Sequence, residues 1–296
     1  MEKLVERVSA RNPLVAAPAL AVQFFLIPLA VVGVAVLVYV GFRSMLTDDR
    51  TPQQYLSEIR SGGTSRRWPA AYELSRLMSD PNVRGDRQLA PALVKAFMDA
   101  KDDDPRIRRY LALAIGRLDP PLPSEAIAQL SAALDDPDSE ARISAIWALG
   151  SSGDAAVVSR LTPLYESPDA GIRKMVVYAL GALPGDMQLV TLRTALSDST
   201  ADVRWNAAVA LSRHGSRDGT AVIRQMLDRP YVEQTVKRDV RQDEDEDPVG
   251  DVMISGLRAA ATLKEDSLRS SVEGLGHQDR SMRVRQAALE AIRAMQ

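Results

Sequence analysis

The sequence predicts an all-α protein, an α-solenoid of about seven two-helix repeats preceded by one transmembrane helix. Three observations predict this fold class. A pattern centred on an arginine recurs through most of the 296 residues, with small residues around it. A long stretch near the N-terminus lacks charged side chains. No window alternates apolar and polar residues with the period of two that marks a β-strand.

The first element is an apolar stretch at 14–42, in which Tyr39 is the only ionisable side chain. Its 29 residues exceed the roughly 20 that span a bilayer, and they exceed the apolar core of a cleaved signal peptide. We therefore predict a flank at 1–13 and a transmembrane helix at 14–46. Basic residues are equally frequent on both sides, so the positive-inside rule does not fix the orientation.

Large C-terminal domains cross a membrane largely regardless of their charge. We therefore expect a single-pass protein of a bacterial-type inner membrane, with the solenoid on the extracytoplasmic side. The alternative is a solenoid held on the cytoplasmic face.

A tether and capping helix are expected at 47–65, followed by a repeat array at 66–296. In each repeat an arginine is followed seven residues later by Leu or Ile, and three successive arginines lie 31 residues apart. With the arginine as position zero, apolar residues recur at −1, +3, +4 and +7, which is one stripe of an α-helix. A degenerate copy has Gly256 in the arginine position. The arginine column consists of Arg67, Arg108, Arg142, Arg173, Arg204 and Arg285.

Each arginine helix is preceded by another amphipathic segment, as at 125–134 and 187–196. The joints between helix pairs are rich in Asp, Ser and Pro, which suit helix N-termini. Gly116, Gly150 and Gly181 stand at +8, where we expect them to end the second helix. Each repeat is therefore a pair of helices, and stacked pairs make an α-solenoid.

The recurring pattern Asp-x-x-Val/Ile-Arg-x-x-Ala-Ala/Val-x-Ala-Leu-Gly resembles HEAT repeats, particularly the short variety named for phycobilisome lyases. The resemblance covers most of the chain after the apolar stretch, and it predicts the fold more strongly than any activity. It implies that the arginines pair with acids at the repeat turns, where Asp138, Asp169 and Asp202 are available. The arginine column is then structural. The alternative is an anion-binding groove, for which the guanidinium group is well shaped.

Aromatic residues recur at +1 and +5 of the second helices, positions one turn apart on the same helix face. The resemblance implies that second helices line the concave side of the solenoid, where aromatic side chains are frequent hot spots for a partner. The alternative is that the rings pack between the two helices of their own repeat. The predicted partner-binding residues are Trp68, Tyr72, Trp147, Tyr178 and Trp205.

The sixth repeat contains an insertion at about 229–248. Five successive acids, Asp243 to Asp247, repel one another and favour a solvated surface loop. Insertions at one edge of a solenoid are also familiar places for binding elements. The glycine turn and closing Glu of a calcium-binding EF-hand are missing, so the acids predict no metal site.

Composition and motifs argue against most catalytic classes. The chain has no cysteine and two histidines, His214 and His277, neither followed by Glu. The paired His-Glu motifs of deoxyhypusine hydroxylase, a HEAT enzyme, are therefore missing. A net charge of −2 disfavours nucleic-acid binding, and no P-loop, G-x-S-x-G or G-x-G-x-x-G motif occurs. We predict no catalytic residue, no metal and no cofactor.

The sequence thus predicts a non-catalytic, membrane-anchored scaffold, or an accessory subunit of a membrane complex. Its predicted partner is a membrane-associated protein bound through the solenoid surface, and no nucleic acid is expected. The alternative is a lyase or isomerase of the bilin-lyase type, or a small-ligand-binding protein, that uses the solenoid groove.

Overall fold

A computed structural model describes residues 26–46, 50–86, 88–236 and 247–296. The chain divides into two compact units, Met1–Thr51 and Pro52–Gln296. The described part of the first unit is dominated by α2 (Ile27–Leu46), whose described side chains are exposed. No helix among the described residues is long and apolar enough to cross a membrane. The transmembrane helix expected at 14–46 is therefore not supported, and its first twelve residues, 14–25, lie outside the described ones.

The second unit is an array of paired helices, and none of its described residues belongs to a strand. The predicted all-α solenoid is thereby confirmed. The first helices of the pairs are α3 (Pro52–Ser61), α6 (Leu89–Asp99), α8 (Ser124–Ala132), α10 (Val158–Leu161), α12 (Leu189–Ala195), α14 (Thr220–Met226) and α17 (Arg269–Gln278). The second helices are α4 (Thr64–Leu77), α7 (Pro105–Gly116), α9 (Ser139–Gly150), α11 (Ala170–Ala182), α13 (Ala201–Arg213), α16 (Pro248–Leu263) and α18 (Met282–Ala294).

Short elements connect or extend these pairs. The helix α3 lies in the range assigned to a tether and capping helix, and it packs on α4 within the solenoid unit. The remaining elements are α5 (Pro81–Arg84), α15 (Arg229–Thr235), η3 (Ala133–Asp135), η4 (Ala155–Val157), η5 (Thr162–Glu166) and η6 (Asp266–Leu268).

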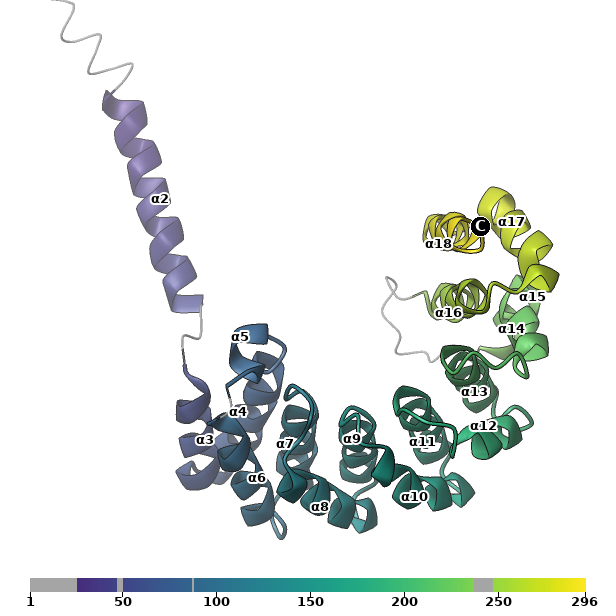
Figure 1. Cartoon of the computed structure of the whole chain (residues 1–296). Coiled ribbons are helices and arrows are strands. Elements are labelled where there is room, and N and C mark those ends of the chain that lie inside the picture. The colour runs from purple at the N-terminus through teal and green to yellow at the C-terminus, as the bar shows by residue number, and fades with distance from the viewer. Residues whose placement is uncertain (1–25, 47–49, 87, 237–246) are drawn as a thin grey trace, which may run out of the picture. The chain divides into compact units, whose positions relative to one another are not determined.

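The second helices stack directly on one another. From α7 onward they follow one side of a curved row, and the first helices follow the other side (Figure 1). We call the second helices the inner helices and the first helices the outer helices. The leucines at +7, such as Leu149, Leu180 and Leu211, are completely buried between the layers. Burial of a leucine side chain contributes about 2 kcal/mol, so this column is a main source of cohesion along the stack.

The glycines at +8 allow the inner helices to approach closely. A Cβ atom on Gly150 would lie 2.7 Å from Cα of Ala179, and one on Gly181 would lie 2.4 Å from Cβ of Ala210. Gly116 meets Ala148 in the same way, at 2.7 Å. As expected, Gly116 and Gly150 are the last residues of α7 and α9, and Gly181 lies one residue before the end of α11, but none of the three has a positive φ. Glycine is needed here because a side chain would force adjacent inner helices apart.

Candidate functional site

An arginine from one repeat joins the next repeat through a buried aspartate. The guanidinium of Arg173 donates from Nε and Nη2 to the carboxylate of Asp198, at 2.9 and 3.0 Å, and from Nη1 to the carbonyl of Ser167 at 3.0 Å. Arg108 likewise donates from Nε and Nη2 to the carboxylate of Asp136, at 2.6 and 3.0 Å. Each aspartate also accepts a hydrogen bond from the backbone N–H of the residue two positions later, Asp138 or Thr200. These two residues are the N-caps of the following inner helices, α9 and α13. The pairs therefore hold successive repeats in register.

The electrostatics of these pairs favours ionised carboxylates. The hydrogen bond from Arg173 lowers the pKa of Asp198, against the opposing effect of burial. Burial raises the pKa of Asp136, but the hydrogen bonds from Arg108 and from the backbone of Asp138 outweigh it and leave the pKa below its ordinary value. Burial, together with the charge of Asp198, raises the pKa of Tyr165 to about 12, and the hydroxyl of Tyr165 donates to that carboxylate at 3.1 Å.

The acids differ from those expected at the repeat turns. Asp138 and Asp169 accept backbone N–H groups as N-caps of α9 and α11, and Asp202 pairs with Lys174 at 3.4 Å. A carboxylate at an N-cap is turned into its own helix and is not available to the preceding repeat. The residues that receive the guanidinium stand earlier in the joint. Asp136, Asp198 and Asp279 each lie six residues before an arginine of the column, and this spacing is the signal that identifies them.

The remaining column members differ in their partners. Arg67 pairs with Asp103 and also donates to the carbonyl of Ile59, at 2.7 Å. Arg142 donates to the carbonyls of Asp136 and Pro137, at 2.6 and 3.3 Å.

The last two column members, like Arg142, have no carboxylate partner among the described residues. Arg204 donates to the carbonyl of Asp198 at 2.7 Å and reaches the hydroxyl of Tyr231 at 3.4 Å. Arg285 donates to the carbonyls of Asp279 and Arg280.

One arginine that pairs with a buried aspartate of another repeat was missed by the sequence analysis. Arg229, at the start of α15, donates to both carboxylate oxygens of Asp279, at 2.8 and 2.6 Å. Its side chain is 14% exposed and that of Asp279 is 1% exposed. Arg229 thus supplies the guanidinium that Gly256 lacks, but it lies outside the period of the pattern.

The predicted aromatic residues have different environments. Tyr72 and Tyr178 are exposed, at 42% and 38%, whereas Trp68 and Trp147 are half-buried. Trp205 is 4% exposed and belongs to the hydrophobic core of the C-terminal repeats, so it offers little surface to a partner.

Arginine side chains lie over these rings along the inner helices. Arg117, just after α7, lies 5.8 Å from the ring centre of Trp147 on α9. Arg213, at the end of α13, lies 5.7 Å from the ring centre of Tyr178 on α11. Trp147 and Tyr178 occupy the same position in adjacent repeats. We call Arg117, Trp147, Tyr178 and Arg213 the central row, which crosses four successive inner helices.

The N-terminal repeats extend this arrangement. Arg106 lies 4.5 Å from the ring centre of Trp68. Tyr72 meets Tyr110 edge to face, with ring centres 5.2 Å apart, and Arg109 lies 5.5 Å from the ring of Tyr110. Tyr110 stands at +2 rather than +1 or +5, which is why the sequence pattern did not include it.

A cavity of about 400 Å³ adjoins the central row between α11, α13 and α16. Its lining combines apolar and charged side chains, and the ring of Trp205 forms part of it. The Nε1 donor of Trp205 has no acceptor in the described part of the chain. The other lining residues that matter here are Lys174, Tyr178, Asp202, Val209, Arg213, Met226, Asp251, Val252 and Ser255.

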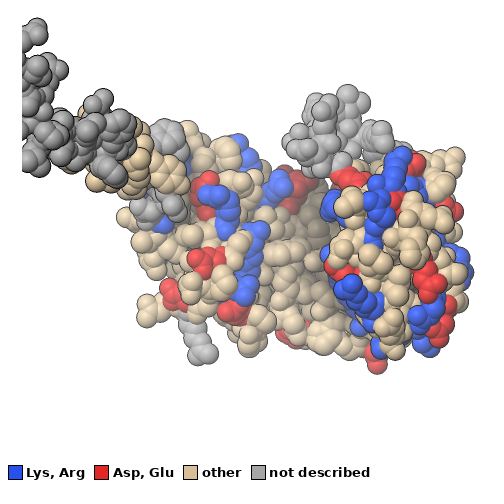
Figure 2. Space-filling view, turned by 90° about the horizontal axis from the view of Figure 1, so that it is seen from above, with Lys and Arg blue, Asp and Glu red and all other residues tan. Residues whose placement is uncertain are grey.

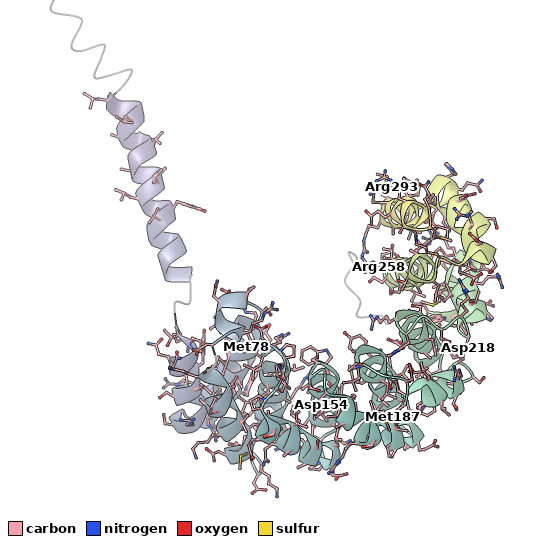
Figure 3. All side chains as sticks on the ribbon, viewed as in Figure 1. Met78, Asp154, Met187, Asp218, Arg258 and Arg293 are labelled. Atoms are coloured by element: carbon pink, nitrogen blue, oxygen red, sulfur yellow. The ribbon has the colours of Figure 1, made fainter. Side chains whose placement is uncertain are left out.

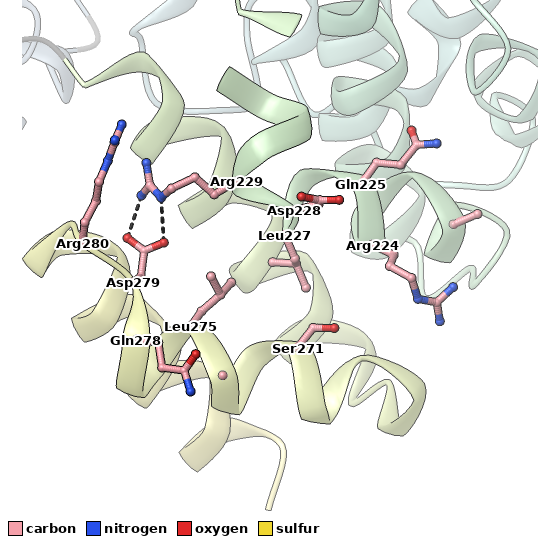
Figure 4. A pocket seen from close by; sticks show the side chains of 12 residues that line it. Arg224, Gln225, Leu227, Asp228, Arg229, Ser271, Leu275, Gln278, Asp279 and Arg280 are labelled. Carbon is pink, nitrogen blue, oxygen red and sulfur yellow. Dashed lines mark hydrogen bonds and ion pairs between the residues drawn. The ribbon is translucent and has the colours of Figure 1, made fainter. Parts of the chain in front are cut away.

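A larger cavity, of about 840 Å³, lies between α14 and α17 on the side of the outer helices (Figure 4). The pair of Arg229 and Asp279 lies at one end of it, and Arg280 there pairs with Glu233 at 2.6 Å. These two pairs are matched within the chain, and no aromatic side chain among the described residues lines this cavity, whereas the central row offers two rings, so the central row is the stronger candidate for binding.

The comparisons with known proteins agree with this architecture. Residues 90–181 and 160–243 match the family model described as HEAT repeats, and together they cover just over half of the chain. The complex of CpcE and CpcF of phycocyanin lyase from Nostoc sp. PCC7120 is 16% identical over 85% of this chain and 97% of that one, with a TM-score of 0.54. No curated protein shows a significant match to the chain.

Two further solved structures are less similar. A designed armadillo repeat protein in complex with the peptide (KR)4 is 16% identical over 82% of this chain and 98% of that one, with a TM-score of 0.40. Human deoxyhypusine hydroxylase is 18% identical over 82% and 96%, with a TM-score of 0.35. At such identities the likeness is one of fold alone.

Proposed function

The chain belongs to the HEAT repeat family, and we propose that it is a non-catalytic scaffold that binds a partner protein along its inner helices. The observation that carries this proposal is the central row, in which two rings are flanked by two guanidinium groups. Trp, Tyr and Arg are the residue types that contribute most to protein interfaces.

The geometry of the row favours a macromolecular partner over a small ligand. Three of its residues lie on the successive inner helices α9, α11 and α13, and Arg117 directly follows α7. Packed helix axes lie about 8–10 Å apart. The row therefore extends over roughly 25 Å or more, which suits a helix or an extended segment. A guanidinium held over a ring is also partly ordered before binding, so less side-chain entropy is lost on association.

We further propose that the segment 14–46, with its apolar stretch at 14–42, places this scaffold at a membrane, with the solenoid on the extracytoplasmic side. Support comes from the sequence, because the 29 residues at 14–42 contain Tyr39 as their only ionisable side chain. About 20 apolar residues are enough to span a bilayer. Extraction of native membranes with alkaline carbonate tests the location. Retention in the membrane pellet is expected, and release into the supernatant would contradict it. Protease protection in intact spheroplasts then tests the side, because an extracytoplasmic solenoid is cleaved without lysis.

Site-specific photo-crosslinking tests the scaffold proposal. A photoreactive phenylalanine analogue replaces Tyr178 on the inner face, in the full chain expressed in its native cells. The matched control carries the same analogue at Arg160, an exposed residue of the outer helix α10. We expect one discrete cross-linked protein from position 178 and none from position 160. Cross-linking of the same protein with equal yield from both positions, or none from position 178, would contradict binding along the inner helices.

A further inference from the structure

The lining of the α11–α13–α16 cavity carries two basic side chains, Lys174 and Arg213, and two acidic ones, Asp202 and Asp251, but not all four are paired. Asp202 pairs with Lys174 at 3.4 Å, and Asp251 pairs with Arg283 at 2.7 Å. Both acids of the cavity lining are therefore already neutralised by a cation of a neighbouring helix. By contrast, Arg213 has no carboxylate within ion-pair distance among the described residues, and its guanidinium lies over the ring of Tyr178.

A second uncompensated arginine lies one turn from the cavity. Arg258 follows Ser255 of the cavity lining by three residues, so the two share a face of α16. Arg258 is exposed and has no described acidic partner. Arg293, on the neighbouring helix α18, is likewise exposed and has no acidic partner in the part of the chain that the structure describes (Figure 3). In the view of Figure 2, basic and acidic side chains lie interspersed on both sides of a largely uncharged hollow.

The wall of the cavity supplies an apolar surface next to these cations. Val209, Met226 and Val252 line it together with Trp205. An occupant that matches this surface has an apolar side chain close to carboxylate groups. A purely charged ligand would leave the apolar wall unused, and a basic ligand would meet two uncompensated guanidinium groups.

We propose that the partner of the scaffold docks as an acidic peptide segment that interleaves carboxylates with apolar side chains. One apolar side chain occupies the α11–α13–α16 cavity, and neighbouring carboxylates bind Arg213 and Arg258. This inference rests on the proposed scaffold function and specifies the chemistry of its partner. Because the chain as a whole carries a net charge of −2, attraction for an acidic segment depends on this local arrangement and not on overall charge.

The test uses fluorescein-labelled model peptides and fluorescence anisotropy on the full-length protein in mild detergent. The acidic peptide is (Glu-Leu)4, and its comparators are (Lys-Leu)4 and (Glu-Ser)4. We expect (Glu-Leu)4 to bind at least about tenfold more tightly than either comparator, with an affinity that falls as salt is raised. Equal or tighter binding of (Lys-Leu)4, or no binding of (Glu-Leu)4 at 1 mM protein, would overturn the proposal.

Substitutions of Arg213 and Arg258 test whether these two arginines bind the carboxylates of the peptide. Combined replacement, Arg213→Gln with Arg258→Gln, should weaken (Glu-Leu)4 binding by about tenfold or more, because two charge-assisted contacts are lost. Arg213→Lys should retain part of the affinity, since it keeps the charge but loses the planar guanidinium that lies over the ring of Tyr178. The control Arg160→Gln removes an exposed cation of the outer helix α10 and should change affinity less than twofold. An unchanged affinity in the double variant, with an unchanged melting curve, would overturn the proposal.

Trp205 provides a local readout of cavity occupancy. In a variant with Trp68→Phe and Trp147→Phe, it is the remaining tryptophan of the chain. Saturating (Glu-Leu)4 should shift its emission, whereas (Glu-Ser)4 should not. An emission that stays constant on saturation would overturn the placement of the apolar side chain. If the cross-link from position 178 persists while the peptides show no preference for acid, the scaffold function stands and this inference fails.

Discussion

The repeats from α7 to α13 and those from α14 to α18 both pair a buried aspartate with an arginine, but the arginine comes from a different part of the repeat in each region. In the first region the arginine column is regular, and Arg173 joins Asp198 across one repeat. In the second region α15 and residues 237–246 lie between α14 and α16 in the sequence. Gly256 stands where an arginine is expected. The buried Asp279 still receives a bidentate guanidinium, which now comes from Arg229 on α15.

The comparison shows that the stack requires a guanidinium beside the buried aspartate. The arginine that supplies it need not stand at the arginine position of the repeat. An unpaired carboxylate with 1% exposure would be strongly destabilising, so some cation must reach it. The regular column is unable to supply one, because a Cβ on Gly256 would lie 2.9 Å from Cβ of Met226. The close approach of α14 and α16 therefore excludes a side chain there, and the cation is delivered from α15.

The largest expected effect tests whether the two regions are equivalent. Arg229→Ala and Arg173→Ala should each lower the free energy of unfolding by about 3 kcal/mol, because each leaves a buried aspartate unpaired. Arg142→Ala should cost only about 1 kcal/mol, since Arg142 bonds to carbonyls. Urea unfolding followed by circular dichroism measures the differences, with the exposed Arg160→Ala as the control. A cost for Arg229→Ala no greater than that of the control would show that the interrupted region does not depend on its substitute arginine.

The next prediction separates close packing from helix propensity. Gly181→Ala places a methyl group 2.4 Å from Cβ of Ala210, so it should destabilise the protein by about 1–3 kcal/mol. Gly274→Ala in α17 meets nothing within 4 Å and should stabilise it by about 0.5–1 kcal/mol, because alanine is the better helix former. Effects of the same sign in the two variants would refute close approach as the reason for glycine in the regular region.

A smaller effect concerns acid stability. The hydrogen bond from Arg173 lowers the pKa of Asp198. Burial raises the pKa of Asp279, but the hydrogen bonds from Arg229 and from the backbone of Ser281, together with the nearby arginine charges, outweigh it and leave this pKa lowered as well. A carboxyl with a lowered pKa in the folded state contributes stability above its ordinary pKa of about 4 and loses it as the pH falls further. Melting temperatures between pH 6 and pH 2 should therefore fall less steeply in Asp198→Asn and in Asp279→Asn than in the parent protein. Asp186→Asn, which alters an exposed carboxylate, should leave the slope unchanged.

The sequence predicted the repeat fold because its signal is repeated. An apolar stripe, an arginine and a small residue recur at fixed spacing, and each recurrence supports the same helix pair. The paired aspartates Asp136, Asp198 and Asp279 could also be identified from spacing, since each lies six residues before an arginine of the column. They lie only two residues before the N-cap residue of the next inner helix, and after Asp136 that residue is another aspartate, Asp138. Arg229 has no such periodic signal, because its role depends on where the insertion leads the chain.

Burial of the aromatic residues was less predictable for a related reason. In the N-terminal repeats a residue at +1 stays partly exposed, as Trp68 does. At the border of the interrupted region the same position is covered, and Trp205 joins a core that includes Met226 and Met253. The helix period defines a face, but the covering of that face depends on the next repeat.

The last prediction tests this difference between the two regions with fluorescence. Acrylamide should quench a variant that retains Trp147 alone more efficiently than one that retains Trp205 alone, because Trp205 is 4% exposed and Trp147 is half-buried. The other two tryptophans are replaced by phenylalanine in each variant, and free tryptophan gives the upper limit of quenching. If Trp205 were quenched as efficiently as Trp147, the repeats around the insertion would open in solution. The core that Trp205 shares with Met226 and Met253 would then be the part of the solenoid that yields first, since local opening begins where packing is interrupted.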